Sequence, residues 1–170
     1  HGIEQLVRDA RIAPIYEGTN GIQALDLVGR KMPMHTGRLL KSFFHVVKEY
    51  LEKNSFNYNL SEFIPPLVKS FGRLQQVTSF IASKGLNNPD EAAGPATDYL
   101  KMFSLVAIGY VWTQYAEISF NKQNDDPEGF YKAKIASGKY YMLKILPETG
   151  SIMSSILSGA KYYNDFDDKY

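Results

Sequence analysis

Apolar residues recur at intervals of three or four along almost the whole chain, which is the spacing of helices that bury one face. The first such segments predict short helices over residues 3–11 and 20–31. Pro14 and Gly18 stand between them, so we expect residues 12–21 to form irregular turns rather than regular helix. No segment shows the strict alternation that predicts a half-buried strand.

Longer amphipathic segments follow between residues 34 and 163. They predict four or five long helices joined by short polar turns, which is typical of an antiparallel helix bundle. The expected helices cover about residues 36–53, 60–85, 89–121, 125–145 and 152–157. The pattern therefore predicts an all-α fold.

Prolines divide this pattern. Pro65 and Pro66 should kink or restart the helix that contains them, because proline lacks the amide hydrogen of the helical ladder. Pro89 stands where a first helical residue is expected, after Asn88, and Pro95 falls in the early turns of the same helix. Pro147 should break or bend the last long helix.

Composition narrows the class of protein. Hydrophobic residues make up 44% and charged residues 22% of the 170 positions, as in ordinary soluble globular proteins. The net charge of +1 provides no field that would attract nucleic acid, so we expect no nucleic-acid partner. The longest apolar run, residues 102–112, is about half the ~20 residues of a membrane-spanning helix. The chain has no cysteine, which fits a reducing compartment, and we expect it in the cytoplasm.

Few residues suggest metal or nucleotide chemistry. The three histidines, His1, His35 and His45, do not have the spacing of metal ligands, and we expect no metal site. The glycine-rich phosphate-binding patterns G-x-x-x-x-G-K-[ST] and G-x-G-x-x-G do not occur in the sequence.

One segment, residues 8–23, combines groups that can carry chemistry. Glu17 stands beside Gly18, whose missing side chain lets a ligand approach the backbone closely. A helix begins just after them, with Thr19 or Asn20 as its N-cap, and its first amides favour anions such as phosphate. Taken from the residues alone, the favoured interpretation is a capped turn between helices with a solvated glutamate, and a functional site is the alternative.

A resemblance to a known family distinguishes these alternatives. The run Tyr-Glu-Gly-Thr at residues 16–19, with Ile-Gln at 22–23 and Arg-Asp-Ala-Arg-Ile at 8–12 before it, resembles the C-terminal signature of the flavin-dependent acyl-CoA dehydrogenases. Residues 2–31 are most similar to a longer bacterial subgroup that carries an additional C-terminal helical domain. Residues 98–103 and 130–134 resemble that additional domain more loosely. The resemblance implies that residues 1–33 end the dehydrogenase bundle and that residues 34–170 form the additional helical domain.

The resemblance also implies roles for the central residues of the motif. Glu17 corresponds to the base that removes the α-proton of an acyl-CoA thioester, and the product is the trans-2-enoyl-CoA. Its backbone amide would also donate to the thioester oxygen. Tyr16 and Gly18 would flank the thioester and contact the substrate.

The cofactor implied by the family is FAD. Thr19 and Asn20, at the start of the following helix, would lie near its diphosphate, where helix amides suit anions. Gln23 matches the motif as a further cofactor contact. Many members carry Gln at the position of Gly21, so that contact is absent here or is made by the backbone.

The expected partners follow from the same resemblance. They are the acyl-CoA substrate, an electron-transferring flavoprotein and further copies of the chain in a homo-oligomer. Because the domains that would shape the flavin and acyl pockets are not among these 170 residues, we expect the chain alone to hold no FAD and to be inactive. The alternative is a non-catalytic helical module for oligomerisation or interaction.

Overall fold

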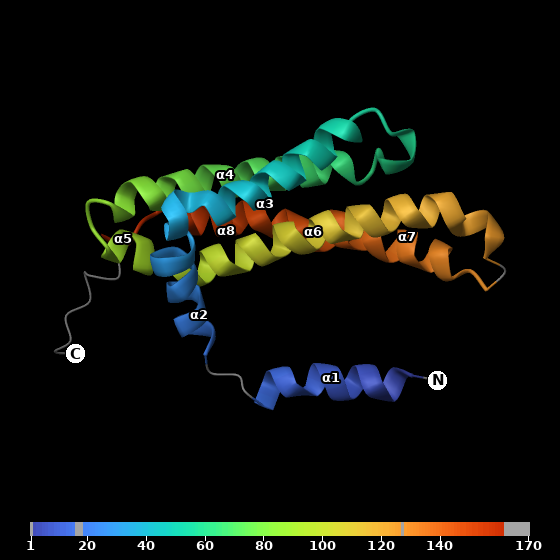
Figure 1. Cartoon of the computed structure of the whole chain (residues 1–170), viewed down its shortest axis with the longest axis horizontal. Coiled ribbons are helices and arrows are strands. Elements are labelled where there is room, and N and C mark those ends of the chain that lie inside the picture. The colour runs from blue at the N-terminus through green and yellow to red at the C-terminus, as the bar shows by residue number, and fades with distance from the viewer. Residues whose placement is uncertain (1, 16–18, 127, 162–170) are drawn as a thin grey trace.

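The computed structural model describes residues 2–15, 19–126 and 128–161, and every regular element within these ranges is a helix. The predicted all-α fold is therefore confirmed. None of the described helices is long and apolar enough to cross a membrane. The α-helices are α1 (Ile3–Ile15), α2 (Asn20–Asp26), α3 (Met34–Lys53), α4 (Ile64–Gly85), α5 (Asp90–Ala93), α6 (Ala96–Lys122), α7 (Phe130–Tyr140) and α8 (Thr149–Leu157) (Figure 1).

Short segments of different pitch connect or extend these helices. The π-helical η1 (Leu27–Lys31) continues α2, and η4 (Tyr141–Ile145) continues α7 in the same way. The 3₁₀ segment η5 (Leu146–Glu148) joins η4 to α8 and contains Pro147, where the sequence predicted a break or bend. Two further 3₁₀ turns, η2 (Tyr58–Leu60) and η3 (Gln123–Asp125), precede α4 and follow α6.

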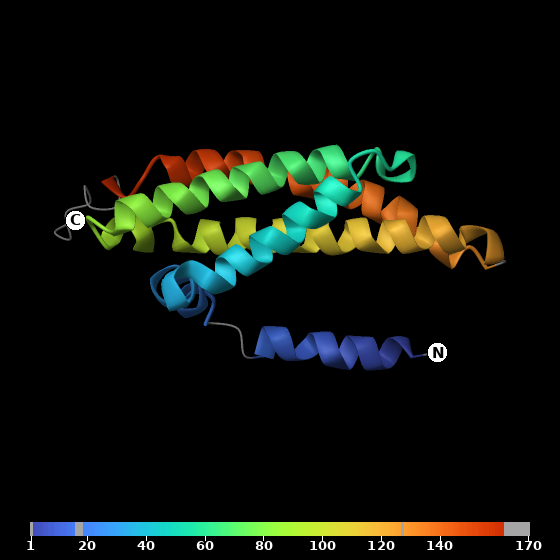
Figure 2. The ribbon, with the colours of Figure 1, turned by 45° about the horizontal axis from the view of Figure 1, so that its top comes forward.

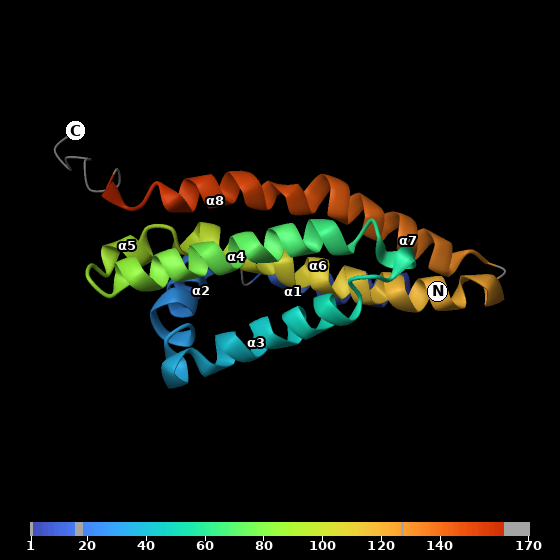
Figure 3. The same ribbon diagram turned by 90° about the horizontal axis from the view of Figure 1, so that it is seen from above.

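The long helices form an antiparallel bundle around α6. Seen from above, α3 and α4 run in opposite directions, and α6 is antiparallel both to α4 and to the continuous α7–η4–η5–α8 arm (Figure 3). Helix α6 packs against α4, α7 and α8, and α2 packs across its N-terminal part. Figure 2 shows α3 crossing α6 obliquely. Because α6 touches most of the other elements, it is the centre of the fold.

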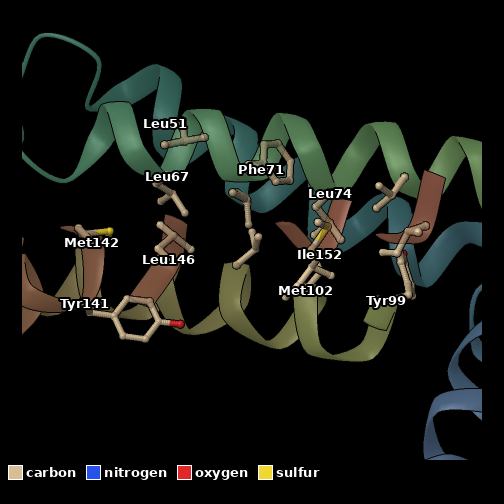
Figure 4. Close-up of a cluster of buried hydrophobic side chains, with 14 of the residues drawn as sticks. Leu51, Leu67, Phe71, Leu74, Tyr99, Met102, Tyr141, Met142, Leu146 and Ile152 are labelled. Carbon is tan, nitrogen blue, oxygen red and sulfur yellow. The ribbon is translucent and has the colours of Figure 1, made fainter. Parts of the chain in front are cut away.

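The core lies where α4, α6 and the α7–α8 arm face each other (Figure 4). Leu67 and Leu74 of α4, Met102 of α6 and Leu146 of η5 are fully buried there. Burial of a side chain of this size contributes about 1.5–3 kcal/mol. These contacts follow the spacing of apolar residues from which the bundle was predicted.

Two predicted boundaries were wrong. Helix α1 continues through Pro14 and ends at Ile15. The fixed φ of proline is compatible with a helix, and the missing amide hydrogen removes only one hydrogen bond to the preceding turn. The helix predicted over residues 89–121 is divided into α5 and α6, and Gly94 and Pro95 stand between them. Pro95 is the N-cap of α6, a position where the missing amide hydrogen costs no helical bond.

Candidate functional site

The predicted catalytic segment connects α1 to α2. Tyr16, Glu17 and Gly18 lie outside the described residues, so their predicted roles stay predictions. The described residues nearest to them are Ile15, which ends α1, and Thr19, which precedes α2. The structure therefore describes the two helices on either side of this segment and not the segment itself.

The predicted cofactor residues occupy the first turn of α2. Thr19 is the N-cap, and its carbonyl accepts the backbone amide of Gln23 at 2.9 Å. The Thr19 hydroxyl makes no capping hydrogen bond, so this side chain does not close the helix end. Thr19, Asn20 and Gln23 are all exposed. The structure thus brings the three residues together on one accessible helix end.

The helix that carries these residues is anchored in the core. Ala24, Val28 and Met32 are buried and stand four residues apart, on one side of α2 and η1. This side packs against α6, as expected for an amphipathic helix that covers a bundle. The start of α2 therefore has a fixed position relative to the bundle.

An ion-pair cluster stabilises the turn from α2 into η1. Arg30 donates through Nε and Nη2 to the carboxylate of Asp26, and the Lys31 ammonium lies 3.2 Å from its Oδ2. The hydrogen bond from Arg30 is the main reason why the pKa of Asp26 falls to about 2; the Lys31 bond and both positive charges act in the same direction, against partial desolvation. Asp26 consequently stays ionised at ordinary pH, and the charges of Arg30 and Lys31 balance its negative charge.

Helix α1, on the other flank, is exposed along its whole length. Among the described residues its side-chain hydrogen bonds lie within the helix: the Gln5 amide donates to Asp9 at 2.7 Å, and Arg8 Nη2 donates to Gln5 at 2.9 Å. Its apolar residues are each half or more exposed, and α1 lies apart from the bundle in Figures 1 and 2. These residues are Ile3, Leu6, Val7, Ile12 and Ile15. A helix with this pattern normally buries its apolar side.

A second candidate site was not predicted. A partly open pocket of about 730 Å³ lies where η1, the start of α3, the end of α4 and α5 meet. Its lining is mostly apolar and includes Lys41 and Thr36. The periodic pattern assigned these apolar residues to helix faces, and helix periodicity alone does not show that the faces leave a cavity between them.

The described part of the chain contains no cluster of three or more histidine and acidic residues that could hold a metal ion. His45 instead lies 3.2 Å from Glu49, one turn further along α3. This is an ordinary surface pair at helical spacing.

Comparison with protein families identifies the bundle. Residues 43–167, most of the chain, match the family model described as "Acetyl-CoA dehydrogenase C-terminal like". The chain belongs to this family. The predicted relation to the C-terminal region of acyl-CoA dehydrogenases is thereby confirmed.

Curated relatives of this acetyl-CoA dehydrogenase C-terminal-like chain are named as dehydrogenases. It is 27% identical over 148 residues to a butyryl-CoA dehydrogenase of Syntrophomonas wolfei, an alignment that covers 84% of the chain and 24% of the relative. It is 28% identical over 162 residues to a 3-methylmercaptopropionyl-CoA dehydrogenase of Ruegeria pomeroyi, covering 91% and 27%. A broad-specificity linear acyl-CoA dehydrogenase of Mycobacterium tuberculosis is 24% identical, with 85% and 25% covered. The chain spans about a quarter of the length of these relatives.

Proposed function

We propose that this chain is the C-terminal portion of an FAD-dependent acyl-CoA dehydrogenase of fatty acid metabolism, which converts acyl-CoA to trans-2-enoyl-CoA with Glu17 as the base. The observation that carries the proposal is the motif at residues 8–23 in a chain that belongs to the family. The names of the relatives support the reaction class. The alignment with the Ruegeria protein covers 91% of the chain.

In the proposed reaction the Glu17 carboxylate accepts the α-proton of the thioester. A carboxylate is suited to this step because it can be held against the substrate and returns the proton to water afterwards. Tyr16 and Gly18 flank the thioester, and the Glu17 amide donates to its oxygen, which stabilises the developing negative charge. FAD would supply the acceptor for the hydride that leaves the β-carbon.

The described residues fit a diphosphate at the start of α2. Thr19, Asn20 and Gln23 are neutral, exposed and able to donate hydrogen bonds. The acid on the same helix, Asp26, is neutralised by its two basic neighbours and would not repel a phosphate strongly. Thr19, Asn20 and Gln23 would therefore hold the cofactor in the complete protein.

The experiment compares the isolated chain with a complete dehydrogenase that contains this sequence. With added FAD, octanoyl-CoA and an artificial acceptor, the chain alone should show no turnover, because the base lacks the groups that orient the substrate. In the complete protein, Glu17→Gln should lower kcat by about a hundredfold or more. Glu49→Gln, on an exposed part of α3, is the matched control and should leave kcat unchanged. Full activity of the Glu17 variant would refute the assignment.

The surface of α6 favours a second function, that of an interaction module. Ile108, Val111, Tyr115 and Ile118 follow helical spacing on α6 and are each 40–50% exposed. An apolar stripe of this kind is typical of an oligomer contact. Sedimentation equilibrium of the chain should then show an oligomer that Val111→Glu dissociates, whereas Gln75→Glu on the exposed side of α4 does not. A monomer at all concentrations would remove this alternative.

Three further parts of the proposal rest on the family and the composition. They are electron transfer to an electron-transferring flavoprotein, a cytoplasmic location, and a division between residues 1–33 and 34–170. Ala24, Val28 and Met32 share one core with the bundle, so the proposed division would separate segments that pack together. Limited proteolysis of the complete protein tests it, since a domain boundary should be cleaved first.

A further inference from the structure

We propose that the pocket formed by η1, α3, α4 and α5 binds an aliphatic carboxylate, with the hydrocarbon chain in the apolar interior and the carboxylate beside Lys41. This site is separate from the predicted catalytic segment at residues 16–18 and does not depend on the proposed dehydrogenase reaction.

The cavity has the size and lining of a site for a small apolar ligand. Its volume is about 730 Å³, within the roughly 300–1,000 Å³ of typical ligand pockets. Leucine, isoleucine, valine and methionine form much of the wall, and glycine and alanine leave room at the end of α4 and on α5. An aliphatic chain gains free energy in such a pocket because it leaves water.

One face of the pocket is defined by a close contact between α4 and α5. A methyl group added at Gly85 would meet the Ala92 side chain at 2.9 Å, so the two backbones are already close together. Thr78 also lines the pocket, and its hydroxyl is hydrogen-bonded to the hydroxyl of Tyr99 in α6. Because several elements hold this wall, the pocket is formed before a ligand arrives, and binding requires little reorganisation.

The charge distribution selects the head group. Among the described residues that line the pocket, Lys41 is the one that carries a charge. Within the described residues its ammonium group has no acidic partner, unlike Arg30 and Lys31 nearby, which pair with Asp26. A single ammonium beside an apolar cavity complements a chain that ends in one negative charge. The same ammonium group repels a ligand with a cationic head group.

The backbone beside Lys41 is held in an unusual conformation. His35, Thr36 and Gly37 have φ values of 51°, 57° and 77°, and Thr36 and Gly37 line the pocket. A positive φ is costly for a β-branched residue such as Thr36, and conformations of this kind concentrate at ligand-binding sites. The turn lies inside the bounds of α3 and redirects the chain between Pro33 and Arg38, and Lys41 stands in the first regular helical turn that follows it.

Isothermal titration of the 170-residue chain with three ligands of equal chain length tests the proposal. The ligands are decanoate, decanol and decyltrimethylammonium, which differ in the charge of the head group. Decanoate should bind most tightly and decyltrimethylammonium most weakly. Lys41→Met should weaken decanoate by about two- to fivefold, as expected for a hydrated ion pair, and should leave decanol unchanged. Lys48→Met, two turns further along α3, should change neither.

Two variants test the location of the site. Ala82→Phe fills the pocket and should abolish the binding of all three ligands. Leu86→Glu, at an exposed position of the lining, should weaken decanoate and strengthen decyltrimethylammonium without disturbing the core. The second variant provides the answer if the first fails to fold.

The proposal would be overturned by equal affinity for the three ligands, by binding that neither variant alters, or by no binding at all. Dimerisation of the chain that Ala82→Phe abolishes would also overturn it, since a second copy would then occupy the pocket. These measurements contain neither flavin nor acyl-CoA, so their failure would leave the proposed dehydrogenase function unaffected.

Discussion

The hydroxyl groups of Thr78 and Tyr99 lie 2.8 Å apart inside the bundle and connect α4 to α6. Thr78 donates its proton to the Leu74 carbonyl at 2.7 Å, so Tyr99 is the donor between the two hydroxyls. Tyr99 is fully buried, and burial raises its pKa to about 12. The pair is therefore part of the core, and Thr78 also lines the pocket.

Alkaline pH should destabilise the chain through Tyr99. In the unfolded chain its hydroxyl ionises near pH 10, whereas in the folded protein it remains protonated to about pH 12. The stabilisation is thus complete below pH 10 and is lost as pH rises from 10 to 12. Urea unfolding at pH 8 and pH 11 should show a smaller loss of stability for Tyr99→Phe than for the wild-type chain. An unchanged loss would contradict the prediction; Tyr58→Phe, at an exposed position, is the control.

Tyr50→Phe should destabilise the bundle by about 1–2 kcal/mol. The Tyr50 hydroxyl donates to Glu117 Oε2 at 2.8 Å, and burial together with this carboxylate raises the pKa of Tyr50. The substitution leaves a partly buried carboxylate without its donor. Chemical denaturation of the single variants and of Tyr50→Phe with Glu117→Gln measures the coupling. Additive effects would show that the bond contributes nothing.

Gly138→Ala should destabilise the protein by about 1–3 kcal/mol. An added methyl group would lie 2.8 Å from Phe63 Cε1 and 3.4 Å from Trp112, inside a packed interface. Gly72→Ala is the matched control because nothing lies within 4 Å of the added methyl group on α4. Alanine has the higher helix propensity, so this control should gain up to about 1 kcal/mol. Thermal unfolding of both variants checks the opposite signs.

Thr36→Asn should stabilise the chain by about 0.5–1 kcal/mol, because asparagine tolerates the positive φ of 57° better than threonine. Urea unfolding measures the change. Thr97→Asn, in the first turn of α6, provides the comparison and should be nearly neutral because the two residues have similar helix propensities. A loss of stability in Thr36→Asn would show that the threonine methyl group packs more favourably than the backbone strain costs.

The helices could be predicted because their apolar residues face one core. The expected helix at 36–53 corresponds to α3, and the restart near Pro65 corresponds to the beginning of α4 at Ile64. The left-handed turn at residues 35–37 could not be predicted, since local preferences oppose a positive φ at Thr36. Tertiary packing determines that conformation.

The two candidate sites differ in how they could be found. The role of Glu17 was inferred from a family resemblance, because a glutamate next to a glycine does not by itself identify a catalytic base. The pocket beside Lys41 carries no motif and results from the way four elements meet. Periodicity identifies the face on which a residue lies, but it does not identify the faces that fail to close on each other.

The central position of α6 has a consequence for unfolding and aggregation of the protein. This helix carries apolar residues on its outer stripe as well as on its buried side, where Val106 and Met102 lie. Any partial opening that releases the α7–α8 arm would uncover a long, largely uncharged helix, and such surfaces associate before they refold. We therefore expect thermal unfolding to be irreversible, with aggregates as the end product and an apparent Tm that depends on the scan rate. Aggregation should be slowest at low protein concentration.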